Sequence, residues 1–299
     1  MISPFIVFIL VLHLIALCSG VTLNVAIVNV HIRSWRQHLL AGGCDKIVVA
    51  MASANVLLQV LLTCGGTLFF SQLFLVLPHS ALSSFFFTFV SFVDLCFWNS
   101  SWLSTYYCLK LVNLSQKLLL WIKSRFSSAV TPLILGSAVG SFLINLPSLW
   151  TTIEMSVDNI GNTSVSDYRL DMALSSIAVI ITLGSGLPFL ITLFCILLSV
   201  KSLLTHVWKL QKNSSEIRYS RLQGHIRAVR TMILLLFLDL MFCTVVMGVV
   251  LQSLNVGPVL GILTWMYMLL YPSFQSMIII TGNPKLLKDV FGKRQNSSE

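Results

Sequence analysis

Long uncharged stretches alternate with short polar segments along the chain. Residues 1–32, 47–93, 126–153, 172–200 and 240–284 contain no Lys, Arg, Asp or Glu. A helix needs roughly 20 mostly apolar residues to cross the hydrocarbon core of a bilayer, so each stretch is long enough for a span. Turn sequences at 77–80 and 255–258 divide the two longest stretches, and Asp94 and Asp239 each lie within a further apolar segment.

This pattern predicts an all-α membrane protein with a single domain of seven transmembrane helices. The expected spans cover residues 5–30, 47–73, 83–109, 130–151, 175–203, 230–252 and 259–281, and a short cytosolic tail follows over 282–299. The first stretch has no basic segment before it and continues to Val30, which favours an uncleaved helix over a signal peptide.

The basic residues fall at alternate ends of these expected spans. Of the 19 Lys and Arg residues, 18 lie in the segments 31–46, 110–125, 201–230 and 285–294, and Arg169 is the exception. Cytoplasmic loops collect Lys and Arg, so we expect the N-terminus outside and the C-terminus in the cytosol. Six spans would place both termini on one side and would destroy this sorting.

Composition supports the same class. Hydrophobic residues make up 56% of the chain, charged residues only 10%, and the mean hydropathy is +0.89, which excludes a soluble globular domain. The net charge of +9 is divided among several loops, so it reports topology and does not indicate nucleic-acid binding. Attraction to anionic inner-leaflet lipid is an expected secondary effect.

The sequence does not indicate an enzyme, a metal site or a cofactor. It has neither a G-x-S-x-G nor an H-E-x-x-H motif. The seven cysteines fall in spans or near their cytosolic ends, and the six histidines are scattered, so zinc-ligand spacing is absent. Asn162 is the one N-x-[ST] sequon in an expected outer loop, where we predict glycosylation; an unmodified polar loop is the alternative.

Four motifs are distributed along the chain: Tyr107-Cys-Leu-Lys-Leu-Val-Asn-Leu-Ser115, Pro188-Phe189 with Ser202-Leu203 and His206, His225-Ile-Arg-Ala-Val-Arg-Thr231, and Tyr271-Pro-Ser273 with Asn283-Pro-Lys-Leu286. They resemble the motifs of one receptor family, the type 2 (bitter) taste receptors. The resemblance covers nearly the whole chain. It implies a G-protein-coupled receptor of the plasma membrane. Such a receptor would bind small bitter molecules in an outward-facing cavity and activate a gustducin-type heterotrimeric G protein that feeds phospholipase C and calcium signalling.

Three positions depart from the family pattern. Asn55 stands where the family has an arginine in the second helix, Gln275 replaces the usual histidine of the seventh, and Asp239 stands where a tyrosine is common. We expect Asn55 and Asn24 to hold the bundle together through an interhelical hydrogen bond. The polar network that the family forms through its arginine must be weaker here or formed by different residues.

Seven residues are predicted to contact the ligand. Asp94, Trp98 and Trp102 share one helical face, since they are spaced by four residues. By register with the family motifs, the others are Asp239, Phe242, Trp265 and Met268. Two acids among aromatic rings would favour a cationic amine. Interfacial packing of the tryptophans, a solvated Asp94, and an Asp239 that is protonated or bonded to a neighbouring helix are the alternatives.

The opposite end is predicted to contact the G protein. The candidates are motif residues and neighbouring basic residues: Tyr107, Lys110, Asn113, Lys123, Arg125, His206, His225, Arg227 and Lys285. The alternative is that most of these residues only follow the positive-inside rule. At the level of the whole protein, a vomeronasal-type pheromone receptor and a small-solute transporter or channel are the competing functions. The helix-three and helix-five motifs favour the taste receptor, and four of the expected spans have too little polarity for a transport path.

Overall fold

The computed structural model describes residues 4–37, 42–71, 76–112, 117–149, 181–211, 219–251 and 258–292. Within these ranges the regular elements are helices, and no strand occurs. Seven of the helices are long and apolar enough to cross a membrane: α1 (Pro4–Arg36), α2 (Gly43–Phe70), α3 (His79–Leu111), α4 (Lys117–Asn145), α7 (Leu187–Gln211), α8 (Tyr219–Leu251) and α9 (Pro258–Gly282). This confirms the predicted seven-helix bundle.

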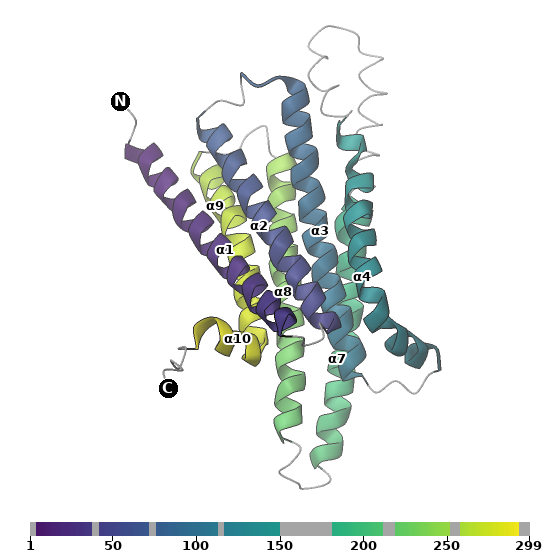
Figure 1. Cartoon of the computed structure of the whole chain (residues 1–299). Coiled ribbons are helices and arrows are strands. Elements are labelled where there is room, and N and C mark those ends of the chain that lie inside the picture. The colour runs from purple at the N-terminus through teal and green to yellow at the C-terminus, as the bar shows by residue number, and fades with distance from the viewer. Residues whose placement is uncertain are drawn as a thin grey trace.

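Two short elements complete the described part. The π-helical segment η2 (Ile181–Gly186) leads directly into α7, and α10 (Pro284–Phe291) follows α9. Figure 1 shows α10 turned sideways at one end of the bundle, near the end of α1. We call this end, which holds Arg36, Leu111 and Gly282, the α10 end.

The bundle is arranged around α3. This helix contacts α2, α4, α7 and α8, whereas α1 packs against α2 and α9 on one side of the bundle (Figure 1). A helix with neighbours all round can bury polar groups on several faces, and α3 does so with Ser91, Asp94, Asn99, Ser100, Ser101 and Ser104. The central position of α3 places these groups between the other helices.

Several helices extend beyond the expected spans at the α10 end. α4 begins at Lys117 instead of near 130, α7 continues to Gln211, and α8 begins at Tyr219 instead of near 230. A hydropathy pattern detects only the part of a helix that lies in the hydrocarbon core. The backbone remains helical into the basic segments because these contain no proline, and Gly224 of α8 is their one glycine.

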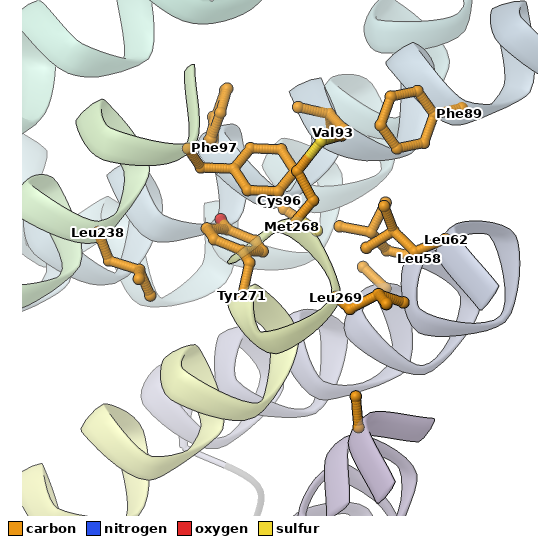
Figure 2. Close-up of a cluster of buried hydrophobic side chains, with 13 residues drawn as sticks. Leu58, Leu62, Phe89, Val93, Cys96, Phe97, Leu238, Met268, Leu269 and Tyr271 are labelled. Atoms are coloured by element: carbon orange, nitrogen blue, oxygen red, sulfur yellow. The ribbon is translucent and has the colours of Figure 1, made fainter. Parts of the chain in front are cut away.

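Apolar side chains fill the bundle and also cover its outside. In one core cluster, side chains from α2, α3, α8 and α9 converge, among them Leu62, Phe97, Leu238 and Met268 (Figure 2). Large apolar side chains also point outward, and Leu190 is 65% and Phe237 63% exposed. Such exposure would be costly in water and is expected of helices whose outer face contacts lipid.

The α9–α10 junction explains the Asn283-Pro-Lys-Leu286 motif. The Asn283 side chain accepts hydrogen bonds from the backbone N–H groups of Lys285 and Leu286, and Pro284 occupies the first turn of α10. These are the preferred residues at a helix N-terminus. Leu286 is buried in a second core cluster with Ile27. The motif therefore starts α10 and anchors it to the bundle.

Candidate functional site

A chain of buried polar side chains connects three helices in the middle of the bundle. The Tyr271 hydroxyl of α9 donates a hydrogen bond to Asp239 Oδ1 of α8 at 2.8 Å. Nε2 of Gln275 donates to the Tyr271 oxygen and to Ser100 Oγ of α3, each at 3.0 Å. All four side chains are buried. An acid this deep in a membrane protein is costly unless it has polar partners, and Tyr271 supplies one.

This network resolves one alternative left open by the sequence. Asp239 is bonded to a neighbouring helix, and its partner Tyr271 belongs to a motif that the sequence had singled out for other reasons. Gln275, which replaces the family histidine, links Tyr271 to Ser100. Two of the three departures from the family pattern, Asp239 and Gln275, therefore lie in a single network. The feature of the sequence that points to this network is the presence of two unusual polar residues, Asp239 and Gln275, in apolar spans.

Aromatic rings pack directly beside the network. The ring centroids of Phe242 and Tyr271 are 4.2 Å apart, and those of Phe97 and Phe242 are 6.3 Å apart with their planes at 76°. Phe189 extends the group, with its centroid 5.1 Å from that of Phe97. Tilted and edge-on rings at these separations attract one another. Phe97 and Phe189 were missed by the sequence reasoning, although Phe189 lies in the Pro188-Phe189 motif.

Two predicted ligand residues of α9 join the same region. Met268 is buried beside Phe97 (Figure 2), and Trp265 packs at the edge of this cluster. The indole Nε1 of Trp265 donates a hydrogen bond to Nε2 of His13 in α1 at 3.0 Å. The partly buried Trp265 thus connects α9 to α1 at the end of the bundle away from α10.

Asp94 has different neighbours from Asp239. Asn145 Nδ2 of α4 donates a hydrogen bond to Asp94 Oδ2 at 2.7 Å, and both residues are buried. On another side the carboxylate lies against Gly184 of η2, where a Cβ atom would overlap it. Asp94 thus joins α3 to α4 and to η2, and it is not the solvated group that one alternative supposed. Neither Asn145 nor Gly184 was singled out from the sequence.

Trp98 and Trp102 lie toward α4. Their ring centroids are 5.5 Å apart, and Trp102 Nε1 donates to Ser137 Oγ of α4 at 3.4 Å. Both side chains are partly buried. The structure therefore divides the predicted ligand residues into two groups. Asp239, Phe242, Met268 and Trp265 lie around α8 and α9, while Asp94, Trp98 and Trp102 lie on the α3–α4 side.

A third polar cluster holds α1, α2 and α9 together. Asn55 Nδ2 donates to Asn24 Oδ1 at 3.3 Å, which confirms the predicted interhelical hydrogen bond. Asn24 Nδ2 also donates to the Pro272 carbonyl oxygen at 3.4 Å, and the Cys96 thiol of α3 donates to Asn55 Oδ1 at 3.6 Å. The neutral Asn55, in the family arginine position, thus links α2 directly to α1 and α3, and Asn24 links α1 to α9.

The candidate G-protein contacts that the structure describes lie at the α10 end. Lys110, Arg125 and Lys285 are exposed, whereas Tyr107, His225 and Arg227 are partly buried. The Lys110 ammonium lies 6.0 Å from the ring centroid of Tyr106, at the outer limit of a cation–π contact. Ser202, from the second motif, donates to the Leu111 carbonyl at 3.4 Å and ties α7 to the end of α3.

Four predicted site residues cannot be placed in the same way. Asn113 and Asn162 lie outside the described residues. Lys123 and His206 lie in α4 and α7, but their side chains are outside what the structure describes.

Comparison with known proteins agrees with this architecture. Residues 1–293 match the family model for taste receptor protein (TAS2R). The chain is 25% identical over 295 residues to taste receptor type 2 member 40 of Gallus gallus, covering 95% of this chain and 93% of the relative. It is 24% identical to taste receptor type 2 member 2 of Homo sapiens, covering 92% of this chain and 93% of the relative. A match over nearly the whole chain, on a seven-helix bundle, shows that this multi-pass plasma-membrane protein belongs to the type 2 taste receptor family.

Proposed function

We propose that the chain is a bitter taste receptor that binds small molecules inside the bundle and signals through a gustducin-type heterotrimeric G protein. The observation that carries this proposal is the buried chain from Asp239 through Tyr271 and Gln275 to Ser100. It connects α8, α9 and α3 next to aromatic rings that a small molecule could contact. Binding pockets for such molecules are mostly apolar with a few placed polar groups.

The proposed ligand contacts are Asp94, Trp98, Trp102, Asp239, Phe242, Trp265 and Met268. Phe242 and Asp239 are packed against neighbouring side chains, so an agonist that reaches them must displace part of this packing. A cationic agonist would compete with Tyr271 for the Asp239 carboxylate. Loss of that hydrogen bond would weaken the contact between α8 and α9 and favour an arrangement with an open α10 end.

The α10 end is the proposed cytosolic face. It would present Tyr107, Lys110, Asn113, Lys123, Arg125, His206, His225, Arg227 and Lys285 to the G protein. Support comes from the positive-inside distribution of the sequence and from the position of the motif residues at this end. In this orientation the N-terminus and Asn162 lie outside the cell.

The test is calcium imaging in cells that express the chain with a promiscuous G protein, screened with a broad panel of bitter compounds. We expect calcium responses to some of them. Absence of any response, despite confirmed surface expression, would contradict the proposed function. Replacement of the promiscuous G protein by gustducin then tests the assignment of the partner.

The same assay tests the two acids. We expect Asp239→Asn and Asp94→Asn to raise the half-maximal concentration of cationic agonists about tenfold, and that of neutral agonists much less. Asp289→Asn is the matched control, because it makes the same chemical change at an exposed position of α10. Equal losses for cationic and neutral agonists would contradict charge pairing, although they would leave the receptor function standing.

A further inference from the structure

A groove on the outside of the bundle lies between α8 and α9 at the α10 end. It encloses about 310 Å³ and is lined by Arg227 and Arg230 of α8, by Thr281 of α9, and by apolar side chains that include Ile226 and Ile278. None of the described residues that line it is acidic. Neither arginine forms an ion pair with a carboxylate in the part of the chain that the structure describes.

A second groove lies on the other side of α8. It encloses about 280 Å³ between α7 and α8, and it shares Ile226, Arg230 and Leu234 with the first groove. Among the described residues that line it, Arg230 is accompanied only by apolar residues, such as Leu203 and Ile233. Arg230 therefore stands between a groove with charged and polar groups and an apolar groove.

The depth of Arg230 corresponds to the level of lipid headgroups. After Arg230, α8 continues through residues 231–251 with Asp239 as its only charged residue. At about 1.5 Å per residue, this length matches the hydrocarbon core of roughly 30 Å. On α9, the last two residues, Thr281 and Gly282, lie beside Thr231 at the same level. The arginines thus lie where phosphates of one leaflet are found.

Besides the arginines, the polar side chains that line the first groove are those of Gln223, Thr231 and Thr281, and none of the three carries a charge. The Thr231 hydroxyl already donates to the Arg227 carbonyl at 2.9 Å. The Thr281 hydroxyl donates to the Met277 carbonyl at 2.8 Å. Recognition of a bound group therefore falls mainly to the guanidinium groups, which bind phosphate oxygens through paired hydrogen bonds.

We infer that these two grooves bind one anionic glycerophospholipid. Its phosphate lies between Arg227 and Arg230, and an acyl chain lies along the apolar groove beside Leu203 and Ile233. Three features favour a lipid over a soluble anion. The first groove is positively charged, it lies at the level of the lipid headgroups, and the apolar groove continues from it. The inner leaflet as the source of the lipid depends on the orientation proposed above, but the binding itself does not.

Native mass spectrometry of the purified full-length receptor in detergent tests the inference. Phosphatidylserine and phosphatidylcholine are titrated separately. We expect tighter binding of phosphatidylserine, a loss of about fivefold in its affinity on Arg230→Gln, and retention of most of the affinity on Arg230→Lys. Lys288→Gln, at an exposed position of α10, is the matched control for loss of one positive charge.

Three results would overturn the inference. Equal loss on Arg230→Gln and Lys288→Gln would indicate diffuse attraction without a site. Equal affinity for the two lipids would show that the site does not select an anionic lipid. Displacement of phosphatidylserine by an equal concentration of soluble glycerophosphoserine would indicate a free-phosphate site, because the apolar groove would then contribute nothing.

Ile226→Glu is a second variant that tests the same inference if Arg230→Gln folds poorly. Ile226 is 49% exposed and borders both grooves, so an added carboxylate should repel the lipid without damage to the core. Retained phosphatidylserine affinity in this variant would also contradict the inference. Agonist responses do not enter the measurement, so failure of the receptor function would not affect its outcome.

Discussion

Tyr271 illustrates how much a single hydroxyl group organises in this bundle. It donates to Asp239 and accepts from Gln275, all within the buried interior. Tyr271→Phe removes the hydroxyl that bonds to Asp239 and Gln275, so we expect the free energy of unfolding to fall by about 1–3 kcal/mol. The measurement is thermal unfolding of the purified receptor in detergent. Tyr267→Phe is the control, since that hydroxyl makes one 3.3 Å bond from a partly buried ring. Equal shifts for both variants would contradict the importance of the network.

Gly184 leaves room for the Asp94 carboxylate, which lies directly against it. An added Cβ atom would overlap the Asp94 carboxylate, so Gly184→Ala should disturb the Asp94–Asn145 hydrogen bond and cost about 1–3 kcal/mol. Gly140→Ala on α4 is the matched control, because its methyl group meets nothing within 4 Å and should be neutral or stabilising. Thermal unfolding distinguishes the two. An unchanged melting temperature for Gly184→Ala would show that Asp94 can move away freely.

At the scale of an element, α10 depends on its first residues. Asn283→Ala removes the side-chain oxygen that accepts from two backbone N–H groups, and should destabilise the helix start by about 1 kcal/mol. We expect hydrogen exchange over 284–291 to accelerate about fivefold while α9 stays protected. Asn283→Asp keeps an acceptor and should retain protection. Unchanged exchange in Asn283→Ala would mean that the buried Leu286 alone holds α10.

At the scale of the whole molecule, the charge distribution predicts the orientation in the membrane. An epitope tag before residue 1 should be accessible to antibody on intact cells, and a tag after residue 299 only after permeabilisation. In the same orientation Asn162 faces the glycosylating lumen, so a glycosidase should shift the mobility of the wild type but not that of Asn162→Gln. Accessibility of the C-terminal tag on intact cells would reverse the proposed roles of the two ends.

The sequence by itself determined the class, the number of helices and the family. These properties depend on the lengths of apolar stretches and on motif residues, which are local in the chain and are imposed by the bilayer. It also identified Asp239 as an unusual residue and predicted the Asn24–Asn55 hydrogen bond, because polar groups in an apolar span need partners.

Only the tertiary structure decided which of these residues meet. Asp94 and Asp239 both lie in apolar spans, yet one bonds to α4 and the other to α9. The partners Asn145, Gln275 and Ser100 come from distant parts of the chain, and helix rotation and packing determine which side chains face each other. The groove beside Arg230 likewise exists only because α7 and α9 flank α8. Spacing along one helix defines a face, but its neighbours define what that face can bind.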